Sequence, residues 1–82
     1  MDIRIDIETR GPVDAVIVSG RLDVSSIKQL TNVCELMKGD FVLDLSNLVF
    51  ADDAAVEVIR SLREKGTDIS GASSFIKFLI DG

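Results

Sequence analysis

Apolar and polar residues alternate at the start of the chain, where Ile3, Ile5 and Ile7 are interleaved with charged side chains. A period of two is typical of a β-strand that has one face in water. A turn signal follows at Gly11, and the continuous apolar run from Ala15 to Val18 indicates a more central strand. Because the connection is too short for a crossover, we expect the two strands to pair antiparallel.

The pattern then changes to a helical period, with apolar residues at steps of three and four. We expect Asp23 or Ser25 to cap this helix, and Lys38-Gly39 to end it. The residues expected to face the sheet are Ile27, Leu30, Cys34 and Met37, with Val33 beside them.

A third strand is predicted from Phe41 to Leu45, parallel to the second because a helix connects them. It runs into a turn that leads to a second helix. Asp52 is a good N-cap for this helix, and Asp53 in its first turn suits the positive end of the helix dipole. Lys65-Gly66 is expected to close it.

On the second helix, one apolar stripe is predicted to face the core and one charged stripe to face water. Arg60 and Glu64 are spaced to form an i,i+4 ion pair. The inward stripe is Ala54, Val58 and Leu62, with Ala55 and Ile59 beside it; the outward residues are Glu57, Arg60, Arg63 and Glu64.

The last part of the chain predicts a short strand around Ile69, between Thr67 and Ser70, and a final helix that starts at Ser73 or Ser74. In this helix Ile76, Leu79 and Ile80 can dock inward. Phe75 and Phe78 lie one turn apart. They either cover a small core or, if exposed, form a surface for a partner or for a homodimer.

The predicted order is therefore β-β-α-β-α-β-α. It indicates an α/β domain over residues 1–82, with a single mixed sheet of about four strands and about three helices. The first strand is expected to lie antiparallel to the others.

Composition narrows the functional classes. The chain has 82 residues, 46% of them apolar, and a net charge of −5 without a run of basic residues. Nucleic acid is therefore not expected as a direct partner, because phosphate binding needs clustered Lys and Arg. No apolar run is long enough to span a bilayer, and the charged start is unlike a signal peptide, so we expect a cytoplasmic protein.

The chain has no His, and the single Cys34 sits at a core-type helix position, so we interpret it as a buried thiol.

Three stretches resemble the STAS domain, the fold of bacterial anti-sigma-factor antagonists. Gly20-Arg21-Leu22-Asp23 is similar to the family's G-x-L-D. The stretch VLDLSNL, residues 42–48, resembles V-L-D-L-S-G-V, and FADDAAV, residues 50–56, aligns with F-I-D-S-S-G-L. The resemblance runs in register from about Val13 to Ile80.

The resemblance implies a protein-binding regulatory module, not an enzyme, with no cofactor. In the family, a Ser/Thr kinase-type anti-sigma factor phosphorylates the first Ser of D-S-S-G, and the phosphate breaks the complex. The equivalent position here is Asp53, which cannot become a phosphoserine. Asp53 is then either a permanent partial mimic of the phosphorylated state or simply an acidic residue that suits a helix start.

The partner-binding residues implied by the resemblance are Asp23, Asp52, Asp53, Ala54, Ala55, Val56 and Glu57. The partner is either an anti-sigma factor that regulates transcription or, as an alternative within the same fold, the ATPase of a phospholipid-transport ABC system. Family members usually continue through a further strand and helix, so an edge of the sheet is expected to stay open to a partner chain.

Two other sites fit the residues less well. Asp44 with Asp52 and Asp53 invites a response-regulator interpretation or a Mg²⁺ or Ca²⁺ site. The acidic pair expected after the first strand of a receiver is absent, and no loop spacing supports a metal cage. Asp44 is better interpreted as a residue that orients the following turn through side-chain hydrogen bonds, and no metal is expected.

Overall fold

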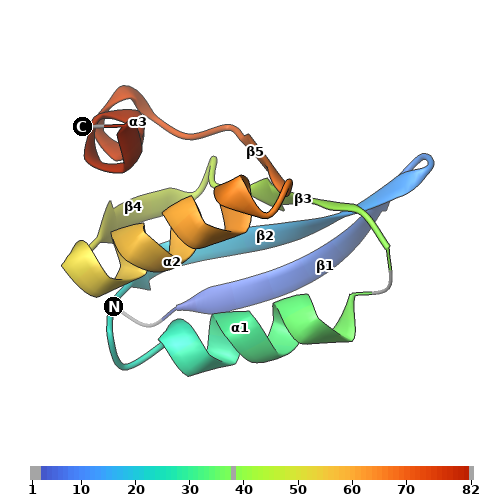
Figure 1. Cartoon of the computed structure of the whole chain (residues 1–82), viewed down its shortest axis with the longest axis horizontal. Helices are drawn as coiled ribbons and strands as arrows, with labels where there is room; N and C mark the ends of the chain where they lie inside the picture. The colour runs from blue at the N-terminus through green and yellow to red at the C-terminus, as the bar shows by residue number, and fades with distance from the viewer. Residues whose placement is uncertain (1–2, 38, 82) are drawn as a thin grey trace.

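The computed structural model describes residues 3–37 and 39–81. Its elements follow the order β1 (Arg4–Arg10), β2 (Val13–Leu22), α1 (Ile27–Leu36), β3 (Phe41–Asp44), β4 (Leu48–Ala51), α2 (Asp53–Glu64), β5 (Asp68–Ser70) and α3 (Ser74–Asp81). Figure 1 shows the long β1–β2 hairpin and the helices arranged around the sheet. The predicted α/β class with one mixed sheet is confirmed.

The sheet has five strands, in the order β1-β2-β3-β5, with β4 paired to β2. β1 and β2 are antiparallel, with Ile5 opposite Val18 and Ile7 opposite Val16. β3 lies parallel to β2, and β5 lies parallel to β3. These directions are the ones that the connection lengths predict, since only a helical crossover allows parallel neighbours.

β4 is one more strand than the sequence predicts. We expected a turn between residue 45 and the second helix. Instead, the segment from Leu48 to Ala51 pairs in parallel with the end of β2, after a register shift between Gly20 and Arg21. The strand has only four residues and is held by the continuation of β2 beyond its pairing with β3, so a local pattern carries little signal for it.

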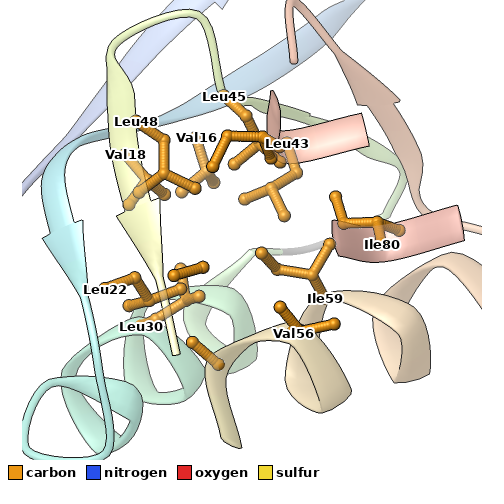
Figure 2. Close-up of a cluster of buried hydrophobic side chains, with 13 residues drawn as sticks. Val16, Val18, Leu22, Leu30, Leu43, Leu45, Leu48, Val56, Ile59 and Ile80 are labelled. Atoms are coloured by element: carbon orange, nitrogen blue, oxygen red, sulfur yellow. The ribbon is translucent and has the colours of Figure 1, made fainter. Parts of the chain in front are cut away.

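One face of the sheet packs against α1 and α2, and the core lies between them (Figure 2). The core cluster includes Leu30 of α1 and Ile59 of α2. Its members on the side of the sheet are Val16 and Val18 of β2, Leu43 of β3, and Leu45, which directly follows β3. α3 packs against α2 and β4, and contributes Ile76 and Ile80 to the same core.

The inward face of α2 is rotated relative to the prediction. Ala55, Val56 and Ile59 are buried, whereas Ala54, Val58 and Leu62 are only half-buried. Ala55 and Ile59 were predicted beside the inward stripe, and Val58 and Leu62 still pack against the core, so the buried face is shifted toward Val56. α3 also packs against α2 and adds Ile76 and Ile80 to the core, which the sequence of α2 alone does not reveal.

The ends of α1 also differ from the prediction. The N-cap is Ser26, not Asp23 or Ser25, and its side chain makes no capping hydrogen bond. The helix ends at Leu36, with Met37 as its C-cap, and Lys38 of the predicted stop lies outside the described residues. The inward face agrees with the prediction: Leu30 is buried, and Val33, Cys34 and Met37 pack beside the core.

α3 begins one residue after Ser73, whose hydroxyl accepts a hydrogen bond from the Ile76 N–H at 3.2 Å, so the predicted helix start is confirmed. The two aromatic rings of α3 do not cover the core, contrary to the simpler interpretation of the sequence. Phe75 is 51% exposed and Phe78 is 72% exposed. Because Ile76 and Ile80 turn inward, the geometry of the helix places both rings on an outer flank.

Candidate functional site

The start of α2 is fixed by Asp52, which uses both oxygens of its carboxylate within the fold. Oδ1 accepts a hydrogen bond from the Ala55 N–H at 2.9 Å, which confirms the predicted N-cap. Oδ2 accepts a hydrogen bond from the Val24 N–H at 3.0 Å. One side chain thus ties the segment before α1 to the first turn of α2, two regions 28 residues apart.

Asp53 has the opposite surroundings. It is exposed in the first turn of α2, and within the described part of the chain its carboxylate has no hydrogen bond or ion pair from a side chain. Its negative charge favours the positive end of the helix dipole. Asp53 is therefore free to meet a partner in solution.

The other residues predicted at the start of α2 differ in whether their side chains are buried in the core or exposed to solvent. Ala55 and Val56 are buried in the core, so their side chains support the helix instead of offering contact atoms. Ala54 is half-buried. Glu57 is exposed, and its carboxylate lies 3.2 Å from the guanidinium of Arg60, three residues later.

Asp23 organises the segment that adjoins this helix start. Its Oδ1 accepts hydrogen bonds from the Ser25 N–H at 3.1 Å, from the Ser25 hydroxyl at 2.6 Å and from the Ser26 hydroxyl at 3.2 Å. The hydrogen bond from the Ser25 hydroxyl is the main reason that the pKa of Asp23 lies below its usual value. Asp23 thus links Ser25 and Ser26 to the end of β2.

Val24 is the residue at this site that the sequence analysis missed. Its side chain is 71% exposed, while its N–H is bound to Asp52. The available signal was an apolar residue directly after Gly20-Arg21-Leu22-Asp23, among polar turn residues. We define the α2-start surface as Asp23, Val24, Asp53 and Glu57, gathered around the half-buried Asp52.

Asp44 does not belong to the α2-start surface. It is 6% exposed, at the end of β3, and its Oδ2 lies 2.6 Å from the guanidinium of Arg10. Its Oδ1 accepts hydrogen bonds from the Ser46 hydroxyl at 2.6 Å and the Ser46 N–H at 2.9 Å. The predicted role of Asp44 in orienting the following turn is confirmed.

The backbone at Gly71 lies close against Asp44 and Ser46. A Cβ atom added at Gly71, which has a φ of +73°, would lie 2.9 Å from Asp44 Oδ1 and 2.9 Å from Ser46 Cβ. The hydrogen bond from the Ser46 hydroxyl is the largest cause of the lowered pKa of Asp44. Across residues 3–37 and 39–81, no three His, Cys, Asp or Glu side chains are grouped closely enough to hold a metal ion.

Cys34 agrees with its interpretation as a core-type thiol. It is half-buried, and burial raises its pKa, with the nearby charge of Glu35 adding to the effect. A thiol with a raised pKa is a poor nucleophile near neutral pH.

In the described part of the chain, no helix is both long and apolar enough to cross a membrane.

Comparisons with known proteins identify the fold. The structure is similar to that of an uncharacterized protein of the DUF3478 family with a SpoIIAA-like fold from Shewanella loihica PV-4, with a TM-score of 0.55 and 19% sequence identity. The similarity covers 93% of this chain and 72% of that chain. No family model matches the sequence, and no curated protein is significantly similar to it. The chain has a SpoIIAA-like fold, which is the fold of STAS domains.

Proposed function

We propose that this protein is a non-enzymatic regulatory module that binds a partner protein through the α2-start surface. The observation that carries the proposal is the contrast between two adjacent carboxylates. Both carboxylate oxygens of Asp52 accept backbone hydrogen bonds within the fold, whereas Asp53 is exposed and has no ion pair among the described residues. This helix start presents an apolar side chain, Val24, beside two outward acidic groups, Asp53 and Glu57, and a partner surface with basic side chains would complement their charge.

The partner that the sequence resemblance favours is a Ser/Thr kinase-type anti-sigma factor. Binding would sequester the anti-sigma factor, release a sigma factor and thereby raise transcription. In the sequence resemblance, Asp53 corresponds to the Ser that is phosphorylated in such antagonists. A carboxylate has about one negative charge, against roughly −1.5 to −2 for a phosphoserine, and it lacks the third oxygen. Asp53 would then set the affinity permanently, without a switch.

The test replaces Asp53 by Ser, which restores a hydroxyl and removes the charge. Wild type, Asp53→Ser and the control Glu64→Gln are used as immobilised baits in lysate of the source cell, and bound proteins are identified by mass spectrometry. Glu64 is exposed at the opposite end of α2, so its variant tests general charge effects. The affinity of the purified partner and its transfer of phosphate from ATP are then measured for each bait.

We expect an anti-sigma kinase to bind Asp53→Ser with a Kd that differs several-fold from wild type, and to phosphorylate only the Ser variant. Glu64→Gln should behave like wild type. If the captured kinase binds all three baits equally and transfers phosphate to none of them, the regulatory role of position 53 is wrong.

A second candidate keeps the fold and changes the partner. The absence of a hydroxyl at position 53 also suits a STAS subunit that binds the ATPase of a phospholipid-transport ABC system without phosphorylation. In this case the same baits would capture an ABC ATPase. Its binding should be equal for wild type and Asp53→Ser, and should be lost when Val24 is replaced by Glu.

A further inference from the structure

The free edge of the sheet at β5 carries a hydrogen-bonding pair that points away from the protein. β5 ends the order β1-β2-β3-β5 and pairs only with β3 among the described strands. The Ser70 carbonyl accepts a hydrogen bond from the Leu45 N–H at 2.8 Å, so the backbone groups of Ser70 face β3. Alternate residues of a strand direct their groups to opposite sides. The N–H and C=O of Ile69 therefore face the open edge.

A groove of about 640 Å³ lies along this edge, between β5, the end of α2 and α3. Ile69, Ala72 and Ile80 give it an apolar lining. Its walls carry four charged side chains. Arg63 and Asp81 neutralise each other at 2.6 Å. Lys77 and Asp68 also line the groove, and neither has an ion-pair partner within the described residues.

We propose that the β5 edge binds an extended segment of a partner protein as an added strand. One residue of that segment would exchange two hydrogen bonds with the N–H and C=O of Ile69, as strands added to a sheet edge do. Lys77 and Asp68, the two groove charges without an ion pair among the described residues, determine which side chains the segment needs. It carries an acidic side chain that reaches Lys77 and a basic side chain that reaches Asp68.

A second copy of this chain fits the edge less well. A strand of three residues with an exposed Asp is the kind of edge that natural sheets use to prevent pairing with themselves. Two chains of net charge −5 also repel each other. A foreign segment with its own basic residue offsets the charge of Asp68 and avoids the repulsion between two acidic chains.

The β5 edge is distinct from the α2-start surface. Arg63 and Gly66 in the groove follow the last turns of α2, whereas Asp53 begins the helix. At 1.5 Å per residue, ten residues separate Asp53 from Arg63 by about 15 Å along the axis. Failure of one site to bind therefore leaves the other site untouched, and the two proposals can be tested separately.

The probe is a displayed library of random linear peptides, selected on the full chain and followed by measurement of Kd for the enriched peptides. Ile69→Pro removes the outward N–H without removing a ladder hydrogen bond, and Pro is tolerated on such an edge. Lys77→Glu reverses one groove charge at an exposed position, so the proposal is still tested if the Pro variant fails to fold. Lys28→Glu, the same charge reversal at an exposed position of α1, is the matched control.

We expect enriched peptides that contain both an acidic and a basic residue and that shift the amide NMR signals of residues 67–71 and 77. Binding should weaken by about tenfold in Ile69→Pro and by a few-fold in Lys77→Glu, and should not change in Lys28→Glu. The proposal is overturned if no peptide is enriched, or if the peptides bind Ile69→Pro and Lys77→Glu as well as wild type. A dimer of the free protein that Lys77→Glu abolishes would also overturn it, since a second copy would then occupy the edge.

Discussion

At the scale of single residues, Asp52 and Asp53 show how the same side chain acquires different roles from its surroundings. Asp52 accepts hydrogen bonds from two backbone N–H groups, those of Ala55 and Val24, and thereby joins two segments of the fold. Asp53 is exposed, and its contribution to folding is limited to a favourable position at the helix dipole. Position 52 is therefore expected to govern stability, and position 53 is expected to govern recognition.

This division of roles predicts unequal stability effects. Asp52→Ala should lower the free energy of unfolding by about 1–2 kcal/mol, because the helix loses its N-cap and the Val24 N–H loses its acceptor. Asp53→Ala should lower it by about 0.3–1 kcal/mol, the usual contribution of one charge at a helix end. Denaturation with urea, followed by circular dichroism, measures both. Equal losses for the two variants would contradict the structural role given to Asp52.

Asp44 gives the stability a dependence on pH. Hydrogen bonds from Ser46 and the ion pair with Arg10 hold its pKa in the folded state below its usual value. An unfolded Asp has a pKa of about 3.9, so this stabilisation is fully present above about pH 4 and is lost as the pH falls through the folded-state pKa. Asp23, whose pKa is also lowered, adds a contribution of the same sign.

The expected result is an unfolding free energy that falls as the pH is lowered below about 4 in wild type, and falls less steeply in Asp44→Asn. Urea denaturation over this range of pH gives the comparison. Asp68→Asn is a suitable control, because Asp68 is exposed and has no ion pair among the described residues. If Asp68→Asn flattened the profile as much as Asp44→Asn, the buried cluster would not be the source of the pH dependence.

At the scale of elements, the sequence predicts what depends on local periodicity and fails where neighbours decide. The alternation from Ile3 to Ile7 and the period of α1 are sufficient to place those elements. β4 depends on the far end of β2, and the inward face of α2 depends on α3, so neither has a complete signal in its own residues. Sequence spacing also pairs Arg60 with Glu64, which the structure contradicts.

The Arg60 side chain of α2 connects this helix to α3 through hydrogen bonds. Its Nε donates a hydrogen bond to the Ile80 carbonyl at 2.6 Å, and its Nη2 donates to the Leu79 carbonyl at 3.2 Å. These carbonyls lie at the end of α3, where a helix has no N–H donors of its own for its last C=O groups. A charged side chain that satisfies them compensates for the shortness of α3, which has eight residues.

Removing this contact should destabilise α3 selectively. Arg60→Ala should lower the free energy of unfolding by about 1.5–3 kcal/mol, the range for hydrogen bonds to a charged group, and should reduce the protection of the α3 amides from hydrogen exchange. Arg63→Ala removes an exposed pair with Asp81 and should cost about 0–1 kcal/mol. Similar exchange rates for α3 in the two variants would show that Arg60 does not hold the helix.

At the scale of the whole molecule, the sequence locates the α2-start surface but not its composition. The aligned motif points to Asp52 and Asp53, Glu57 directly follows this motif, and Asp23 belongs to the motif Gly20-Arg21-Leu22-Asp23. Val24 enters only because a hydrogen bond to Asp52 brings the segment before α1 against α2. Burial of Ala55 and Val56 is likewise decided by the packing of α2 on the sheet and α3, which one sequence does not show.

The distribution of charge over the molecule predicts how association with a partner should respond to salt. The net charge is −5, and the α2-start surface presents Asp23, Asp53 and Glu57. A partner that docks there must offer positive charge, so long-range attraction should speed the encounter. Raising the ionic strength from about 0.05 M to about 0.3 M shortens the screening length, so the association rate should fall.

Measured by stopped flow with the purified partner, the association rate of Asp53→Asn should be lower than that of wild type at low salt. The difference should shrink at high salt, where the charge of Asp53 is screened. Glu64→Gln removes one negative charge of the same size from the opposite end of α2, and so reports the effect of net charge alone. If both variants slowed association equally, the attraction would come from the whole molecule and not from the α2-start surface, and Asp53 would be reduced to a residue that suits a helix start.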